Sequence, residues 1–133
     1  MRRGLIGEHL GHSYSQRIHE TLGGYPYELI EVAPQDLDAW MKNKDFAALN
    51  VTIPYEKAVI PYLEELDERA RRIGAVNTIV NDHGRLIGKN TDYYGCRFML
   101  EQAGIEIQDR KVILLGNGGA AQAVQAVLED LGA

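Results

Sequence analysis

Apolar and polar positions alternate along this chain in short blocks of two kinds. Short apolar runs rich in branched side chains are typical of buried β-strands, and apolar residues at every third or fourth position indicate one face of a helix. The predicted strands are Gly4–Gly7, Tyr27–Val32, Phe46–Val51, Thr78–Val80, Arg85–Ile87 and Val112–Leu115. The predicted helices are Ser15–Leu22, Pro34–Met41, Lys57–Glu65, Asp67–Ile73, Thr91–Ala103 and Gln122–Leu131. This alternation predicts an α/β fold.

Within this pattern, two segments have a distinct character. Asn81-Asp82-His83-Gly84 between two strands predicts a β-hairpin. In the stretch Thr91–Ala103, we expect Tyr94, Phe98 and Leu100 to face inward.

A domain boundary is expected near residues 104–110, where the character of the chain changes. Val112–Leu115 is continuously apolar, as expected for a strand buried on both faces, and a glycine-rich loop follows it. We therefore predict one domain over residues 1–103, then a linker and the start of a second domain over 104–133. A single βα unit cannot cover both faces of its strand. We expect a fragment of a longer protein, with Val112–Leu115 disordered or covered by a second copy.

Composition and charge narrow the class of protein. The chain has 133 residues, 45% of them hydrophobic, and a net charge of −5, which argues against nucleic acid or an anionic membrane as partner. No apolar run approaches the ~20 residues of a membrane span. The single cysteine, Cys96, cannot form an internal disulfide, so we expect a cytoplasmic protein. The four histidines lack metal-ligand spacing, and we expect no metal site.

The glycine-rich loop predicts a dinucleotide site. Gly116-x-Gly118-x-x-Ala121 matches the G-x-G-x-x-G/A fingerprint that follows a strand and opens a helix. The candidate cofactor-binding residues are Gly116, Asn117, Gly118, Gly119 and Ala120. A glycine-rich turn without a ligand is the alternative, and these residues leave open the choice between NAD and NADP.

Polar side chains gather where predicted strands end, and they suit a hydroxylated ligand. They are Ser13 and Ser15 after the first strand, Asn50, Thr52 and Lys57 after the third, and Asn77, Thr78, Asn90, Thr91 and Asp92 farther along. For each residue alone, a turn or a helix cap is the alternative, with Ser15 as a cap in particular. His19 is read as a structural residue of its helix. A lysine beside an aspartate can exchange a proton with a ligand hydroxyl, which oxidation of a secondary alcohol requires.

In their order and spacing, these motifs resemble the shikimate dehydrogenases. The resemblance rests on Gly4-Leu5-Ile6-Gly7, Gly11-His12-Ser13-Tyr14-Ser15, Asn50-Val51-Thr52-Ile53-Pro54, Gly74-Ala75-Val76-Asn77-Thr78, Gly88-Lys89-Asn90-Thr91-Asp92 and the Gly116–Ala121 loop. It implies a three-layer α/β substrate-binding domain followed by the first βα unit of a Rossmann NADP-binding domain. The implied activity is the reversible NADP-dependent reduction of 3-dehydroshikimate to shikimate, in the chorismate pathway of aromatic amino acid biosynthesis.

The resemblance also assigns roles to residues. It implies that Ser13 and Ser15 hold the substrate carboxylate, and that the substrate-binding groups Asn50, Thr52, Asn77 and Asp92 contact the ring hydroxyls. The catalytic pair would be a lysine and Asp92.

In the family the lysine directly follows the aromatic residue, but here Glu56 stands in that place and Lys57 comes one position later. Lys57 either takes the catalytic role or is displaced. The second case describes a non-catalytic shikimate- or quinate-binding relative. A quinate-preferring enzyme and a homodimer both remain compatible with the sequence, and the fragment alone is not expected to turn over substrate.

Overall fold

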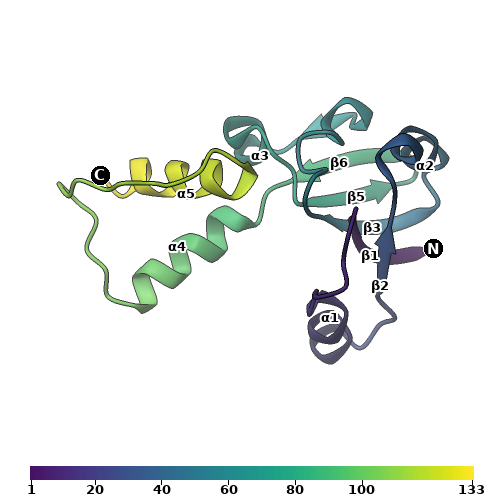
Figure 1. Cartoon of the computed structure of the whole chain (residues 1–133), viewed down its shortest axis with the longest axis horizontal. Coiled ribbons are helices and arrows are strands. Elements are labelled where there is room, and N and C mark those ends of the chain that lie inside the picture. The colour runs from purple at the N-terminus through teal and green to yellow at the C-terminus, as the bar shows by residue number, and fades with distance from the viewer.

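The computed structural model describes residues 1–133 as a mixed sheet flanked by helices, with a helical arm extending from one side (Figure 1). The strands are β1 (Arg2–Gly7), β2 (Glu28–Glu31), β3 (Phe46–Val51), β4 (Glu65–Leu66), β5 (Thr78–Asp82) and β6 (Arg85–Lys89). The helices are α1 (Ser15–Gly23), α2 (Leu37–Asn43), α3 (Glu68–Ile73), α4 (Asp92–Gln102) and α5 (Gly119–Asp130). Two 3₁₀ turns, η1 (Pro34–Asp36) and η2 (Ile60–Tyr62), complete the elements.

The sheet topology brings five chain segments to one edge. The strand order is β2-β1-β3-β5-β6-β4, with β1 parallel to both of its neighbours and β5 antiparallel to β3 and β6. In this register Asn50, near the end of β3, lies opposite Thr78 at the start of β5, and Thr78 lies opposite Lys89 at the end of β6. The ends of β1 and β2 reach the same edge, because they run parallel to β3.

The predicted hairpin is confirmed and links β5 to β6. His83 and Gly84 both have positive φ, 52° and 93°, which is the backbone of a type I′ turn. The Asn81 Oδ1 accepts a hydrogen bond of 2.7 Å from the Gly84 amide and fixes the turn. The turn therefore lies at the sheet edge opposite to the one where β3 ends.

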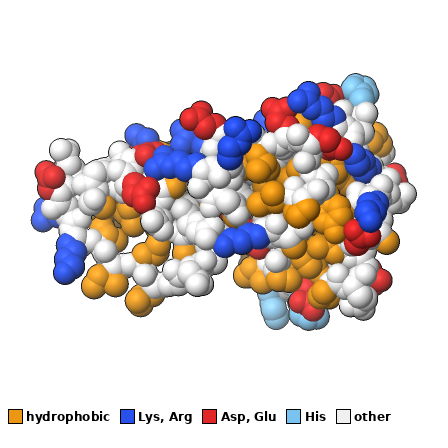
Figure 2. All heavy atoms as spheres, turned by 90° about the horizontal axis from the view of Figure 1, so that it is seen from above, with side chains coloured by type: hydrophobic (Ala, Val, Ile, Leu, Met, Phe, Trp, Pro, Cys, Tyr) orange, Lys and Arg blue, Asp and Glu red, His pale blue; other side chains and the backbone are white.

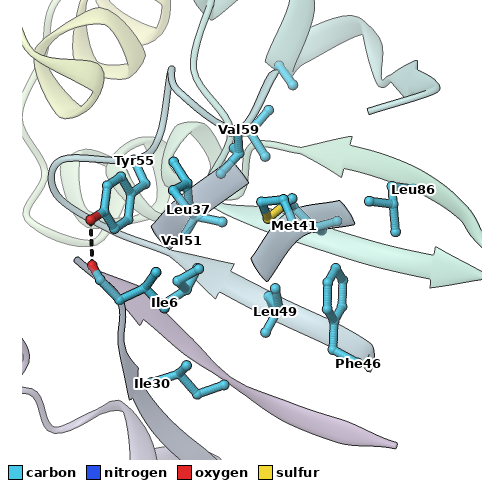
Figure 3. Packing of buried hydrophobic residues seen from close by; sticks show 14 residues of the cluster. Ile6, Ile30, Leu37, Met41, Phe46, Leu49, Val51, Tyr55, Val59 and Leu86 are labelled. Carbon is cyan, nitrogen blue, oxygen red and sulfur yellow. Dashed lines mark hydrogen bonds between the residues drawn. The ribbon is translucent and has the colours of Figure 1, made fainter. Parts of the chain in front are cut away.

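The main hydrophobic core lies between the sheet and the elements that cover it. Ile6, Phe46 and Leu49 from the sheet pack with Leu37 and Met41 of α2 (Figure 3). The buried ring of Tyr55 closes one side, and its hydroxyl donates to the Val32 carbonyl, the dashed contact in Figure 3. This core holds the strand ends, and hence the polar groups that follow them, in fixed positions.

A second core joins α4 and α5 to the sheet domain. Tyr93 of α4 packs with Ile73 and with Ala123, Ala126 and Val127 of α5. The alanines let the helices approach closely, since they have no side chain beyond Cβ. This contact forms the arm in Figure 1 and positions the glycine-rich loop beside the sheet edge.

Three expectations about elements are wrong. Residues 57–65 form turns and the short η2 in place of the predicted helix, because Pro61 interrupts a helix. Glu65, in β4, pairs instead with Ile87 of β6. Tyr94 and Phe98 point outward, 57% and 61% exposed, since α4 turns Tyr93 and Cys96 toward α5.

Val112–Leu115 is not a strand, because the chain places no partner strand beside it. Its side chains are exposed, and hydrophobic atoms are visible on this arm in Figure 2.

Candidate functional site

A cleft of about 1260 Å³ opens at the sheet edge where β1 and β3 end. The predicted polar residues that line it are Ser13, Ser15, Asn50, Thr52, Lys57, Asn77 and Asp92. The start of α5 contributes Gly118, Gly119 and Ala120 to the same cleft, while Gly116 and Asn117 do not line it. The topology thus joins the polar strand ends and the glycine-rich loop in one site.

Ser13 and Ser15 form one wall of the cleft. The Ser13 amide donates to the Leu10 carbonyl at 2.9 Å, and the Ser15 amide donates to Ser13 Oγ at 3.2 Å. The residue that caps α1 is Tyr14, and no side-chain bond caps this helix. The hydroxyl of Ser15 therefore does not act as a helix cap, and both serine hydroxyls keep a donor for a ligand.

Asn50 and Asn77 form the floor of the cleft as parts of one hydrogen-bond network. Asn50 Oδ1 accepts from the Tyr27 hydroxyl at 2.7 Å, and Asn50 Nδ2 donates to Thr78 Oγ1 at 3.2 Å. Asn77 Oδ1 accepts from the Thr91 amide at 2.9 Å, and its Nδ2 donates to Thr91 Oγ1 at 2.9 Å. Both amides are held in place before any ligand binds.

Asn90 has a structural role, unlike its neighbours in the polar set. Its side chain is buried, 2% exposed, and its Nδ2 donates to the Ala75 carbonyl at 3.0 Å. Its Oδ1 accepts from the Asp92 amide at 3.0 Å and so caps the start of α4. The Asp92 carboxylate itself has no partner within the chain and lies at the cleft.

Lys57 lies at the cleft but does not contact Asp92. Its partner is instead Gln122 of α5, whose side-chain amide is oriented so that both its oxygen and its nitrogen have partners. In this orientation Gln122 Oε1 accepts from Lys57 Nζ at 2.8 Å, and Gln122 Nε2 donates to the Ile73 carbonyl at 2.7 Å. Lys57 therefore links the loop that follows β3 to α5. Glu56 also lines the cleft, in the place where the family motif has its lysine.

The glycine-rich loop fits the backbone demands of a pyrophosphate site. Gly116 has φ +124°, which L side chains rarely adopt, and a Cβ built on Gly118 would meet no atom within 4 Å. The first turn of α5 follows directly and presents its N–H groups, as dinucleotide loops do. The open space at Gly118 allows a phosphate to approach the backbone.

Three residues of the site were not anticipated as such from the sequence. His19 lines the cleft, and its ring stacks on Tyr27 with centroids 4.1 Å apart and planes 6° from parallel. Glu31, also at the cleft, accepts from the Leu10 amide at 2.7 Å. Burial raises the pKa of the Tyr27 phenol well above its ordinary value. The spacing of Ser15 and His19 on one helix face was the available signal.

Metal-ligating side chains do not cluster anywhere in the structure. None of the helices combines the length and the apolar composition that a membrane span requires.

Known proteins with similar sequences include NADP(+) shikimate dehydrogenases. The model of the shikimate dehydrogenase substrate binding domain matches residues 5–79. The NADP(+) shikimate dehydrogenase of Halothermothrix orenii is 46% identical over 98% of this chain and 48% of its own length. That of Carboxydothermus hydrogenoformans is 43% identical over 98% of this chain and 49% of its own length. The chain thus spans about half the length of the curated relatives it matches.

Solved structures with the same fold include two similar enzymes. Shikimate dehydrogenase 1 from Peptoclostridium difficile has a TM-score of 0.92 and 37% identity, over 99% of this chain and 52% of that one. The shikimate 5-dehydrogenase of Thermus thermophilus, in complex with NADP(H) and shikimate, has a TM-score of 0.87 and 34% identity. It covers 99% of this chain and 53% of that one. These structures confirm the predicted α/β fold class.

Proposed function

The chain belongs to the shikimate dehydrogenase family, and we propose that it supplies the substrate side of an NADP-dependent enzyme that interconverts 3-dehydroshikimate and shikimate. The observation that carries this proposal is the convergence in one cleft of six polar residues and the glycine-rich loop. The six are Ser13, Ser15, Asn50, Thr52, Asn77 and Asp92. A polyhydroxylated acid needs such a dense set of donors and acceptors.

We propose that the two sides of the cleft divide the substrate between them. Ser13 and Ser15 offer two neutral hydroxyl donors from the wall, which suits the substrate carboxylate. The amides of Asn50 and Asn77 and the Asp92 carboxylate face the cleft from the strand ends, which suits ring hydroxyls. The prearranged amides would bind without losing side-chain freedom, which favours affinity.

The residues that would hold NADP are Gly116, Asn117, Gly118, Gly119 and Ala120, at the start of α5. When bound, NADP(H) supplies or accepts the hydride of the reaction. Because Gly118, Gly119 and Ala120 share the cleft with the substrate groups, this placement supports transfer across a short distance.

The proton of the reaction is assigned to Lys57 and Asp92 in this proposal. Reduction of a ketone places a proton on the new hydroxyl oxygen, and oxidation removes it, so a donor and an acceptor must reach one atom. Both side chains line the cleft, but Lys57 Nζ is bound to Gln122 at 2.8 Å. Lys57 would have to exchange this partner for the substrate.

Shikimate binding tests the substrate assignment on the chain itself. Titration calorimetry is expected to show binding of shikimate, and a Ser13→Ala, Ser15→Ala double variant is expected to bind about tenfold more weakly or worse, since two hydroxyl donors are lost. Thr21→Ala is the matched control, because Thr21 is an exposed hydroxyl of α1 outside the cleft that bonds the Arg17 carbonyl. A chain that binds neither shikimate nor quinate contradicts the proposal.

A non-catalytic shikimate- or quinate-binding relative is the second candidate. Two observations favour it. Glu56 lines the cleft where the family motif has lysine, and Lys57 Nζ is hydrogen-bonded to the Gln122 amide. In that case the cleft binds ligand, but no ammonium reaches the reacting oxygen.

The rates of matched variants separate these candidates. Residues 1–133 are joined to the part of the Halothermothrix orenii relative that this chain does not match, and NADP-dependent oxidation of shikimate is followed. A substantial rate without substitution supports the enzyme. A rate that rises at least about a hundredfold in Glu56→Lys, as expected when a general acid–base group is supplied, supports the non-catalytic relative.

Several finer assignments belong to the same proposal. We place the domain boundary at residues 103/104 and the protein in the cytoplasm. We infer shikimate rather than quinate as the preferred ligand, which competition between the two in calorimetry would test. A homodimer that covers the exposed Val112–Leu115 segment would appear in light scattering as twice the mass of one chain.

A further inference from the structure

The hydroxyl of Tyr27 lies behind the floor of the cleft. Tyr27 is 3% exposed and does not line the cleft, yet its hydroxyl donates to Asn50 Oδ1 at 2.7 Å. Burial raises the pKa of this phenol, so it keeps its proton at every physiological pH and acts as a donor. The ring of His19 is stacked on the Tyr27 ring and limits its movement.

This contact resolves an ambiguity in Asn50. A side-chain amide has two orientations, related by a half-turn, that exchange its donor and its acceptor. In the observed orientation Nδ2 faces two acceptors, Thr78 Oγ1 at 3.2 Å and the Asn77 carbonyl at 3.4 Å. In the reverse orientation the phenol proton of Tyr27 would lose its only acceptor, and a buried donor without a partner is costly.

The orientation of the Asn50 amide also affects the Asn77 amide, through Thr78. Because Thr78 Oγ1 accepts from Asn50, its own proton is free to donate, and it does so to Asn77 Oδ1 at 3.1 Å. Asn77 Nδ2 then donates to Thr91 Oγ1 at 2.9 Å. The hydrogen bonds therefore link Tyr27, across β3 and β5, to Thr91, the residue before Asp92, whose own amide donates back to Asn77 Oδ1 at 2.9 Å.

We propose that Tyr27 is a positioning residue that fixes the Asn50 amide in one orientation and thereby sets which hydrogen-bonding groups the cleft presents to a hydroxylated substrate. The inference rests on the proposed function in one respect, that the substrate is shikimate. Tyr27 touches no substrate and acts through Asn50. Removal of its hydroxyl leaves the orientation to the two longer contacts of Nδ2, with Thr78 Oγ1 at 3.2 Å and the Asn77 carbonyl at 3.4 Å, so the reverse orientation becomes more accessible, and only one of the two matches the substrate.

Shikimate affinity of a Tyr27→Phe chain tests the inference. Calorimetry is expected to show shikimate binding weakened about fivefold to tenfold, because one correctly oriented hydrogen bond to the substrate is lost. Tyr55→Phe is the matched control, because Tyr55 is also buried, 2% exposed, but its hydroxyl bonds the Val32 backbone carbonyl and no site amide. Equal affinity in Tyr27→Phe and the parent chain would overturn the inference.

A double-mutant cycle separates positioning from a general structural effect. If Tyr27 acts through Asn50, Tyr27→Phe weakens binding in the parent chain but has no further effect in an Asn50→Ala chain. The same fold-loss in both backgrounds would show that Tyr27 acts independently of Asn50, and would overturn the proposal.

NMR of the unsubstituted chain gives a reading that needs no ligand and no variant. The side-chain NH₂ protons of Asn50 are expected to show stronger cross-peaks to the Thr78 side chain than to the Tyr27 ring. Cross-peaks to the Tyr27 ring alone, or to both groups equally, would contradict the inference. If the chain binds no shikimate, the proposed function fails while this spectrum still decides the role of Tyr27.

Discussion

At the residue scale, three asparagines of the same polar set have different roles. Asn50 and Asn77 line the cleft, whereas Asn90 is buried and satisfies backbone groups. The residue type does not separate these roles, because an amide serves a ligand and a helix end with the same two groups. Only the partners that the fold brings to each amide distinguish them.

Lys57 shows the same dependence on its surroundings. The sequence places it one position after the family's lysine, which left its role open. The structure supplies a partner that no local pattern indicated, since Gln122 lies 65 residues farther along the chain on α5. The contact exists because the second core docks α5 beside the loop that carries Lys57.

Replacement of Gln122 tests whether its contact with Lys57 matters for ligand binding. In Gln122→Leu, Lys57 no longer has to break a hydrogen bond before it contacts a ligand, so shikimate is expected to bind up to about fivefold more tightly. The Ile73 carbonyl loses its donor, and the free energy of unfolding is expected to fall by about 1 kcal/mol. Calorimetry and urea titration measure the two effects.

The control for that experiment is Gln125→Leu on the same helix. Gln125 is exposed and donates only to Glu129 at 2.9 Å, so neither affinity nor stability should change appreciably. Unchanged shikimate affinity in Gln122→Leu would mean that Lys57 does not contact the ligand.

At the scale of elements, capping residues explain where α3 begins and ends. The Asp67 carboxylate accepts from the Ala70 amide at 2.7 Å and starts α3 one residue later than predicted. Gly74, with φ +72°, ends this helix. Such signals are local, and they were readable in the sequence.

The cap of α4 predicts a stability effect. Asn90→Ala removes the donor to the Ala75 carbonyl and the acceptor for the Asp92 amide, both at 3.0 Å, and the first of these bonds is buried. We expect the free energy of unfolding to fall by about 2–3 kcal/mol, because a cap and a buried hydrogen bond are lost together. Urea denaturation at neutral pH measures this loss.

Asn43→Ala provides the comparison, since Asn43 is exposed at the end of α2 and its side chain makes no hydrogen bond. Its loss should stay below about 0.5 kcal/mol, as for ordinary surface positions. Similar losses for the two variants would show that the Asn90 contacts do not stabilise the fold.

At the scale of the whole molecule, one carboxylate adds polar contacts to the second core, which joins α4 and α5 to the sheet domain. Asp130 of α5 accepts from the Tyr93 hydroxyl of α4 and forms an ion pair with Arg72 of α3 at 2.8 Å. The Tyr93 hydrogen bond, and next the Arg72 guanidinium, lower the pKa of Asp130 below its ordinary value. Asp130 therefore links the three helices, and both of its contacts favour the ionised form.

This contact predicts a dependence of stability on pH. Because the folded-state pKa of Asp130 is depressed, its contribution is complete above the ordinary aspartate pKa of about 3.9 and is lost as the pH falls through the folded value. We expect Asp130→Asn to be less stable than the parent chain at pH 7. We also expect the difference to shrink on acidification to about pH 2, as urea titrations at several pH values would show.

Glu106→Gln is the matched control, because Glu106 is exposed and has no ion-pair partner in the chain. Its difference from the parent chain should be small at both pH values. An Asp130→Asn chain whose deficit stays constant with pH would contradict the assignment.

The sequence by itself determined the α/β class, the main strands, the hairpin at His83-Gly84 and the glycine-rich loop. These features follow from local periodicity and from the backbone preferences of single residues, which act over a few positions. The same local information predicted seven of the polar residues that line the cleft, because polar groups at strand ends of a buried sheet share an edge, whereas Thr78, Asn90 and Thr91 of the predicted set do not line it.

Tertiary structure alone decided the distant partners of the polar groups in and around the cleft. It placed Gln122 against Lys57, Tyr27 behind Asn50, and Asn90 in the interior. It also left Val112–Leu115 unpaired, although its composition is that of a strand. The physical reason is the same in each case: a hydrogen bond or a strand pairing needs a second group, and that group comes from a distant part of the chain.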